Sequence, residues 1–154
     1  MRKYLFILVA LVVSLSFACG PSVKDVSDPN MMFVSASNSS LAKIPVGGFG
    51  YKKSTVSPQS WDKWASAAAP VVKGVIDKLP DGYVLQVTGH TDASGPEEPA
   101  GRKPGNIKIS TDRALMVYNS LKKKGITSPK MTYKGVGSSE PLDGVAPRDG
   151  SQRR

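Results

Sequence analysis

Apolar residues recur at the spacing of an amphipathic helix in two stretches of the chain. The repeat in the first stretch is formed by Trp61, Trp64, Ala68, Val71, Val75 and Leu79. Ser57 and Pro58 come before it, as an N-cap and a first-turn proline do, and Pro80-Asp81-Gly82 follows it as a stop. The pattern predicts a helix that begins after Ser57, ends near Leu79 and buries one face.

The second helical pattern lies in the C-terminal half of the chain. Its apolar face is formed by Ala114, Val117, Tyr118 and Leu121. We expect Ser110 to cap this helix at its N-terminus. Lysines 122–124 suit the negative end of the helix dipole, and Gly125 is the residue type that commonly follows a helix.

Short β-rich stretches separate and follow these helices. Residues 83–88 predict a central strand, residues 131–134 a further strand, and residues 46–53 a weak strand broken by glycines. The order is then β-α-β-α-β. The expected fold class is α+β, a two-layer sandwich in which both helices cover one face of a small sheet.

The first eighteen residues have the pattern of an export signal. Arg2 and Lys3 give a positive start, residues 4–13 are almost all apolar, and residues 14–18 are mostly small. The apolar run is shorter than the roughly 20 residues that span a bilayer. We therefore predict a signal peptide over residues 1–18.

Cys19, the single cysteine of the chain, stands at the expected cleavage point. Residues 15–19 resemble a bacterial lipobox, in which the cysteine is lipidated and becomes the new N-terminus. The alternative is cleavage by ordinary signal peptidase, whose small-x-small rule Ser16 and Ala18 satisfy. We favour lipidation of Cys19, because exported proteins rarely keep one unpaired thiol. The lipid would anchor the protein to a membrane.

Residues 19–43 follow as a Ser-, Asp-, Asn- and Pro-rich segment with no sustained period. We interpret this segment as a flexible linker that contains a candidate short strand at residues 31–34. Residues 44–154 would then form the folded domain.

Composition narrows the function classes further. One cysteine and one histidine exclude a disulfide framework and a Cys/His zinc cluster, and we expect neither a metal nor a cofactor. The 21 basic residues against 12 acidic ones give a net charge of +9. A basic exported protein indicates an anionic cell-envelope surface as its neighbour. The export signal argues against nucleic acid as a partner.

Two motifs carry a family resemblance. Gly89-His90-Thr91-Asp92 ends the central strand, and Gly95 follows. The second helix and its approach contain Asn106, Ile109, Ser110, Arg113, Ala114, Val117 and Leu121. Together with residues 125–126, 135–137, Pro141 and 152–154, these residues resemble the OmpA-like peptidoglycan-binding domain over residues 44–154. A lipid-anchored member would resemble the peptidoglycan-associated lipoproteins or the OmpA-type lipoproteins of spirochaetes.

The resemblance implies non-catalytic binding of peptidoglycan stem peptides of the diaminopimelate type. The aspartate that matches Asp92 takes the ligand ammonium, and the arginine that matches Arg113 takes its carboxylate. Thr91 and Asn106 would shape the pocket, His90 and Ser110 would belong to the same site, and the first amides of the helix would add positive potential. The protein would tether the outer membrane to the cell wall, with its domain facing the periplasm.

Other interpretations of these residues stay open. Asp92 and Arg113 could form only a structural ion pair. Glu97 and Glu98 could join His90 and Asp92 around a cation, although a solvated loop is the simpler interpretation. Trp61 and Trp64 could stack on sugars, although their spacing favours a core position.

Two other functions remain as alternatives. One is a surface-exposed adhesin or virulence lipoprotein, which is compatible with a tethered domain. The other is a cell-wall hydrolase that uses His90 and Asp92, although no nucleophile motif or carboxylate pair accompanies them.

The chain departs from the family pattern in two places. The spacing of 21 positions from Asp92 to Arg113 is longer than usual, and residues 96–104 would form a lid or change the ligand preference. Family members also continue past the arginine pair with a final strand. Without that strand the sheet would have a gap: either the sequence is truncated, or the segment at residues 31–34 fills the gap.

Overall fold

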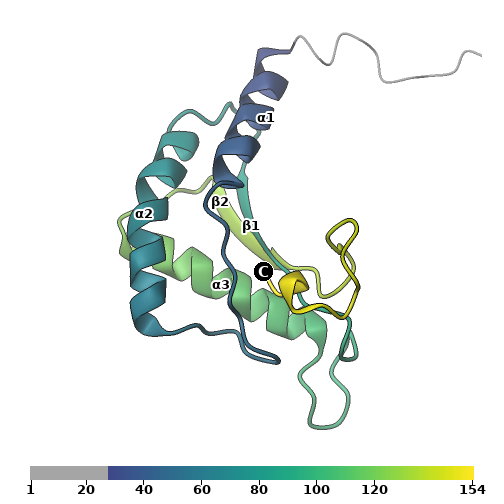
Figure 1. The fold of residues 1–154 in the computed structure, drawn as a ribbon. Helices are drawn as coiled ribbons and strands as arrows, with labels where there is room; N and C mark the ends of the chain where they lie inside the picture. The colour runs from purple at the N-terminus through teal and green to yellow at the C-terminus, as the bar shows by residue number, and fades with distance from the viewer. Residues whose placement is uncertain (1–27) are drawn as a thin grey trace, which may run out of the picture.

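The computed structural model describes residues 28–154 (Figure 1). The elements are, in order, α1 (Pro29–Leu41), α2 (Pro58–Ile76), β1 (Leu85–Gly89), α3 (Asn106–Lys123), β2 (Met131–Gly135) and the 3-10 helix η2 (Gly150–Gln152). The predicted signal peptide and Cys19 lie outside the described residues. No helix within residues 28–154 is long and apolar enough to cross a membrane.

The sheet consists of two parallel strands. β1 and β2 pair in register from Leu85 opposite Met131 to Gly89 opposite Gly135. α3 connects the two strands and packs against both of them, and α2 packs against α3 (Figure 1). This arrangement confirms the α+β class.

The core lies between α2, α3 and the sheet. Its buried members are Ala68, Val72, Ile76, Val117, Leu121, Ile126 and Met131. Trp61 and Trp64 stack on each other with ring centroids 5.0 Å apart and pack against this core. The Trp64 indole donates a hydrogen bond to the Ile44 carbonyl at 3.2 Å. Both tryptophans therefore serve packing, as their helical spacing indicates.

The first predicted helix is confirmed as α2, capped by the Ser57 hydroxyl, which accepts from the Ser60 amide. The prediction that Ser110 caps the second helix is wrong, because α3 begins four residues earlier. Ser110 instead faces the sheet, is fully buried, and accepts a hydrogen bond from the Gly137 amide at 2.9 Å.

Two predicted strands are not strands in the structure. Residues 46–53 are irregular, and Gly48 adopts a φ of 78° that a strand does not permit. The segment at residues 31–34 lies inside α1. Asp28 and Pro29 start this helix, because the Asp28 carboxylate accepts from the Asn30 amide at 2.8 Å. The segment predicted as a linker thus contains a helix that contacts α2.

One edge of β1 carries no strand within residues 28–154. On this side the His90 amide donates to the Arg154 carbonyl at 2.7 Å. A groove of about 420 Å³ separates this edge from residues 41–49. The predicted gap in the sheet is therefore present among the described residues, and the segment at residues 31–34 does not fill it as a strand.

Two paired glycines set the distance between sheet and helix. A Cβ on Gly89 would lie 2.1 Å from the Ser110 carbonyl oxygen, and one on Gly135 would lie 2.2 Å from the Thr111 amide nitrogen. The C-terminal ends of β1 and β2 thus contact the backbone of α3 directly. The residues that follow Gly89 therefore begin next to α3.

We predict that Gly89→Ala lowers the free energy of unfolding by about 1–3 kcal/mol, because the new methyl group forces β1 away from α3. Urea denaturation measures this change. Gly74→Ala is the matched control: no atom lies within 4 Å of its Cβ, so replacing this helical glycine should stabilise the protein by about 0.5–1 kcal/mol. A Gly89→Ala protein as stable as the parent would contradict the close packing.

Candidate functional site

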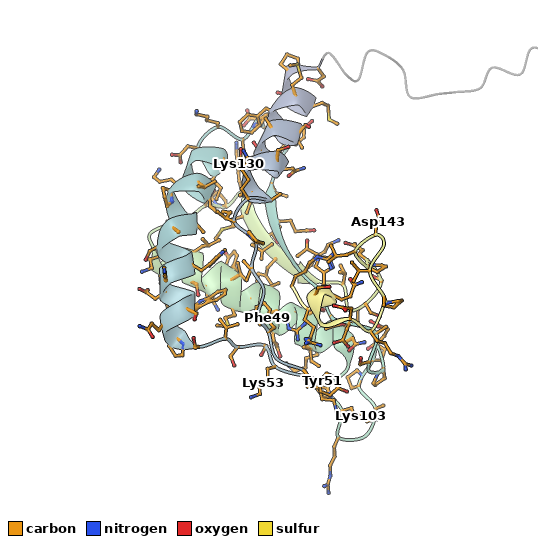
Figure 2. All side chains as sticks on the ribbon, in the orientation of Figure 1. Phe49, Tyr51, Lys53, Lys103, Lys130 and Asp143 are labelled. Carbon is orange, nitrogen blue, oxygen red and sulfur yellow. The ribbon has the colours of Figure 1, made fainter. Side chains whose placement is uncertain are left out.

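The strand-end motif and α3 meet at one small pocket. Four of the predicted site residues line it: Thr91, Asp92, Asn106 and Arg113. Tyr51, Lys52, Lys103 and Arg153 complete its charged and aromatic lining. The cavity measures about 20 Å³, space for about one water molecule. Figure 2 shows Tyr51 and Lys103 near each other at this end of the molecule.

The carboxylate of Asp92 is buried and already holds two partners. One oxygen accepts from the Ser94 amide at 2.9 Å, and the other accepts from Arg153 Nη1 at 2.7 Å. Burial alone would raise the pKa of Asp92, but the hydrogen bonds from Arg153 and Ser94 outweigh burial and lower it. Asp92 is therefore an anion at neutral pH.

The guanidinium of Arg113 is 1% exposed and binds backbone carbonyls. It donates to His90 at 2.6 Å, to Lys53 at 2.9 Å and to Gly50 at 3.4 Å. Its carbon also lies 5.0 Å from the centre of the Phe49 ring. Burial and the charge of Arg153 lower the pKa of Arg113 to about 10. The side chain stays protonated at neutral pH, and two of the five donors of a guanidinium remain for a ligand.

The structure pairs Asp92 with Arg153 rather than with Arg113. No Asp92–Arg113 ion pair within 4.0 Å is found in residues 28–154, so these two residues do not form the simple structural salt bridge. Both nevertheless line the same pocket. Residues 152–154 resemble the family in sequence, but the resemblance assigned Arg153 no role. The sequence match at residues 152–154 is therefore the signal that could have indicated Arg153 as a site residue.

The amides at the start of α3 do not face a ligand, contrary to expectation. The Asn106 amide donates to the Pro96 carbonyl at 2.8 Å, and the Ile107 amide donates to the Glu97 carbonyl at 3.1 Å. The long loop before α3 therefore satisfies the first donors of the helix. The positive potential of the pocket comes from side chains.

Glu97 is part of the structure rather than of a solvated loop. Its carboxylate accepts from the Asn106 amide group at 3.0 Å and from the hydroxyl and amide of Ser138. Burial would raise the pKa of Glu97, but these hydrogen bonds lower it. Asn106 also donates to the Gly95 carbonyl at 3.1 Å, so its amide group shapes the loop. Glu98 is exposed.

The remaining three predicted site residues differ in position. Thr91 lines the pocket, and its buried hydroxyl has no hydrogen-bond partner within the described part of the chain. His90 lines the groove beside β1 instead, and burial lowers its pKa, so it is neutral at pH 7. Ser110 lies under the sheet, between the Ile107 carbonyl and the Gly137 amide.

We predict that Arg113→Lys lowers the free energy of unfolding by about 2 kcal/mol or more, because a lysine ammonium cannot span the three carbonyls and leaves some unsatisfied. Urea denaturation measures the loss. Arg102→Lys, at an exposed position in the long loop, is the matched control and should change stability by less than about 0.5 kcal/mol. Equal stability of both variants would contradict the role of Arg113.

The lowered pKa of Asp92 predicts a pH dependence. Its contribution to stability is complete above the pKa of the unfolded chain, roughly 3.9, and is lost as pH falls through the lower pKa of the folded protein. Asp92→Asn should therefore lose less stability than the parent protein between about pH 5 and pH 2. Urea denaturation across this range measures both slopes. The lowered pKa of Glu97 contributes equally to both proteins and does not affect the difference between them. If stability fell equally steeply with pH in both proteins, the lowered pKa of Asp92 would be refuted.

Comparisons with known proteins agree with this fold. The OmpA-like domain of FopA1 from Francisella tularensis is 26% identical, with a TM-score of 0.52 over 70% of this chain and 65% of that chain, just under two thirds of it. The C-terminal domain of Helicobacter pylori MotB is 17% identical, with a TM-score of 0.52 over 71% of this chain and 80% of that chain, and shares the fold.

A shorter match joins 67 residues, at 36% identity, to the photosystem I P700 chlorophyll a apoprotein A2 of Gloeobacter violaceus, over 44% of this chain but only 7% of that protein. The model of the OmpA family matches residues 49–154, which contain β1, α2, α3, β2 and every residue of the pocket. The chain therefore belongs to the OmpA family.

Proposed function

We propose that this domain binds peptidoglycan non-covalently, through the free end of a diaminopimelate residue in a stem peptide. The observation that carries the proposal is that a buried anion, Asp92, and a buried cation, Arg113, line the same pocket. The free end of diaminopimelate presents an ammonium next to a carboxylate. A zwitterion of this kind needs one anion and one cation a few ångströms apart.

The hydrogen-bonding capacity of the pocket suits this ligand. A carboxylate offers about four acceptor positions, and Ser94 and Arg153 use two of those on Asp92. The ligand ammonium takes a remaining position, while the two unused donors of Arg113 take the ligand carboxylate. The Thr91 hydroxyl, buried without a partner among the described residues, gains one from either group.

The enclosed space of about 20 Å³ is smaller than such a head group. Binding therefore requires the exposed side chains at the mouth to move aside, and Lys52 and Lys103 are the residues placed to do so. The buried pair beneath them keeps its geometry, because backbone groups hold both of its members.

We further propose that the domain acts as a tether. The sequence predicts export and lipidation at Cys19, which would anchor the chain in the outer membrane with the domain in the periplasm. Binding without catalysis fits the site, because His90 lines the groove and not the Asp92 pocket. The two residues that a hydrolase would need are thus not presented to the same ligand.

Co-sedimentation with purified peptidoglycan tests the proposal. Asp92→Asn should weaken binding by roughly 10-fold or more, since a charge-assisted hydrogen bond contributes about 1.5–3 kcal/mol. Asp143→Asn, an exposed position on another loop (labelled in Figure 2), should bind as the parent does. A folded Asp92→Asn protein that sediments like the parent would refute the site. Arg113 variants are poorer probes, because Arg113 also holds three backbone carbonyls.

Competition identifies the head group. Free meso-diaminopimelate should displace the protein from peptidoglycan, whereas Nα-acetyl-lysine amide, which has an ammonium but no carboxylate, should not. Equal competition by the two compounds would show that the Arg113 guanidinium does not bind the ligand carboxylate.

A further inference from the structure

The pocket carries more positive charge than a zwitterion requires. Its charged lining consists of one acid, Asp92, and four bases, Lys52, Lys103, Arg113 and Arg153. Asp92 and Arg153 neutralise each other as an ion pair at 2.7 Å. A bound zwitterion adds no net charge, so these five side chains would keep a net charge of three positive units, and Lys52 and Lys103 would have no anionic partner among them. Uncompensated like charges around one site are unfavourable unless the ligand supplies an anion.

Lys52 is held at the mouth of the pocket by a turn that Arg113 fixes. The Lys53 amide donates to the Gly50 carbonyl at 3.0 Å, and Arg113 binds the carbonyls of both these residues. Lys52, at the tip of this turn, is the one non-glycine residue within residues 28–154 with a positive φ, 57°. Residues held in such sparsely populated conformations cluster at functional sites. Its ammonium lies 5.0 Å from the centre of the Tyr51 ring.

Lys103 also lines the pocket and belongs to the long loop. Lys103 and Ala100 exchange two backbone hydrogen bonds, at 3.0 and 3.1 Å, so the loop forms a small ordered hairpin. The base of the hairpin packs tightly, because a Cβ on Gly105 would lie 2.6 Å from the Glu98 backbone. The hydrogen bonds of Glu97 then fasten this base to Asn106 and Ser138.

Neither lysine has a carboxylate partner within the described part of the chain, where the ion pairs involve other residues. Two ordered segments from distant parts of the sequence thus each bring one lysine without an ion-pair partner among the described residues to the lining of the pocket. Thr91 lines the same cavity, and its hydroxyl is buried without a partner among residues 28–154, which points independently to a polar ligand.

We infer that Lys52 and Lys103 form a second anion subsite that reads a free carboxylate adjoining the diaminopimelate residue. This inference rests on the proposed function. The preferred ligand class is then a stem peptide whose neighbouring D-glutamate α-carboxyl is unmodified, and peptides that carry a primary amide at that position bind less well. The two lysines are specificity-determining residues, whereas Asp92 and Arg113 hold the head group common to both ligands.

Two synthetic peptides separate these roles. One is N-acetyl-γ-D-glutamyl-meso-diaminopimelate with a free glutamate α-carboxyl, and the other carries the same group as a primary amide. Calorimetric titration of the full chain should show tighter binding of the free acid, by about two- to fivefold, as expected for exposed ion pairs. Raising the salt concentration should reduce this preference, because rim charges are screened.

Charge-removing variants assign the preference to the rim. The double variant Lys52→Gln/Lys103→Gln should bind both peptides with similar affinity, close to that of the parent for the amide. Lys78→Gln, an exposed lysine after α2, is the matched control and should keep the full preference. Asp92→Asn should lose affinity for both peptides alike.

The outcomes are distinguishable. Equal binding of both peptides by the parent protein would overturn the subsite and leave the proposed function standing. A double variant that kept the full preference for the free acid would overturn the subsite as well. Failure of the parent to bind either peptide would overturn the proposed function itself.

Discussion

The buried guanidinium of Arg113 is the interaction on which the site depends. A charge removed from water is costly unless hydrogen bonds replace its hydration, and here carbonyls from two separate segments do so. His90 directly follows β1, whereas Gly50 and Lys53 belong to the turn before α2. The same charge therefore joins an irregular loop to a strand end. Arg113 thus helps to position both Asp92 and Lys52 relative to α3, to which it belongs.

This arrangement requires close packing between helix and sheet. Gly89 and Gly135 bring both strand ends against α3, and the Ser110 hydroxyl bonds the Gly137 amide across the same contact. Arg113 lies one turn after Ser110 and so comes to the strand end where Thr91 and Asp92 begin. The acid and the base are carried by regular elements and their immediate ends, which gives the precision that a binding site needs.

Local patterns in the sequence correctly predicted the features that depend on neighbouring residues. The period of apolar residues indicated α2 and α3, the Ser57-Pro58 cap placed the start of α2, and the two motifs brought Asp92 and Arg113 to one pocket. Contacts between distant residues were out of reach. The partner of Asp92 is 61 positions away, and α3 starts early because the carbonyls of Pro96 and Glu97, in the preceding loop, satisfy its first amides. The apolar content of residues 31–34 indicated a strand, whereas the cap at Asp28 started a helix.

The titration behaviour of the pocket favours binding over chemistry. Asp92 has a lowered pKa and Arg113 one of about 10, so both keep opposite charges throughout the neutral range. A general acid or base works best with a pKa near the working pH, and neither residue meets that condition. Histidine has the usual pKa closest to neutrality. Burial lowers the pKa of His90, however, and this residue lines the groove beside β1 rather than the pocket. Fixed opposite charges that exchange no proton are what the recognition of a zwitterion needs.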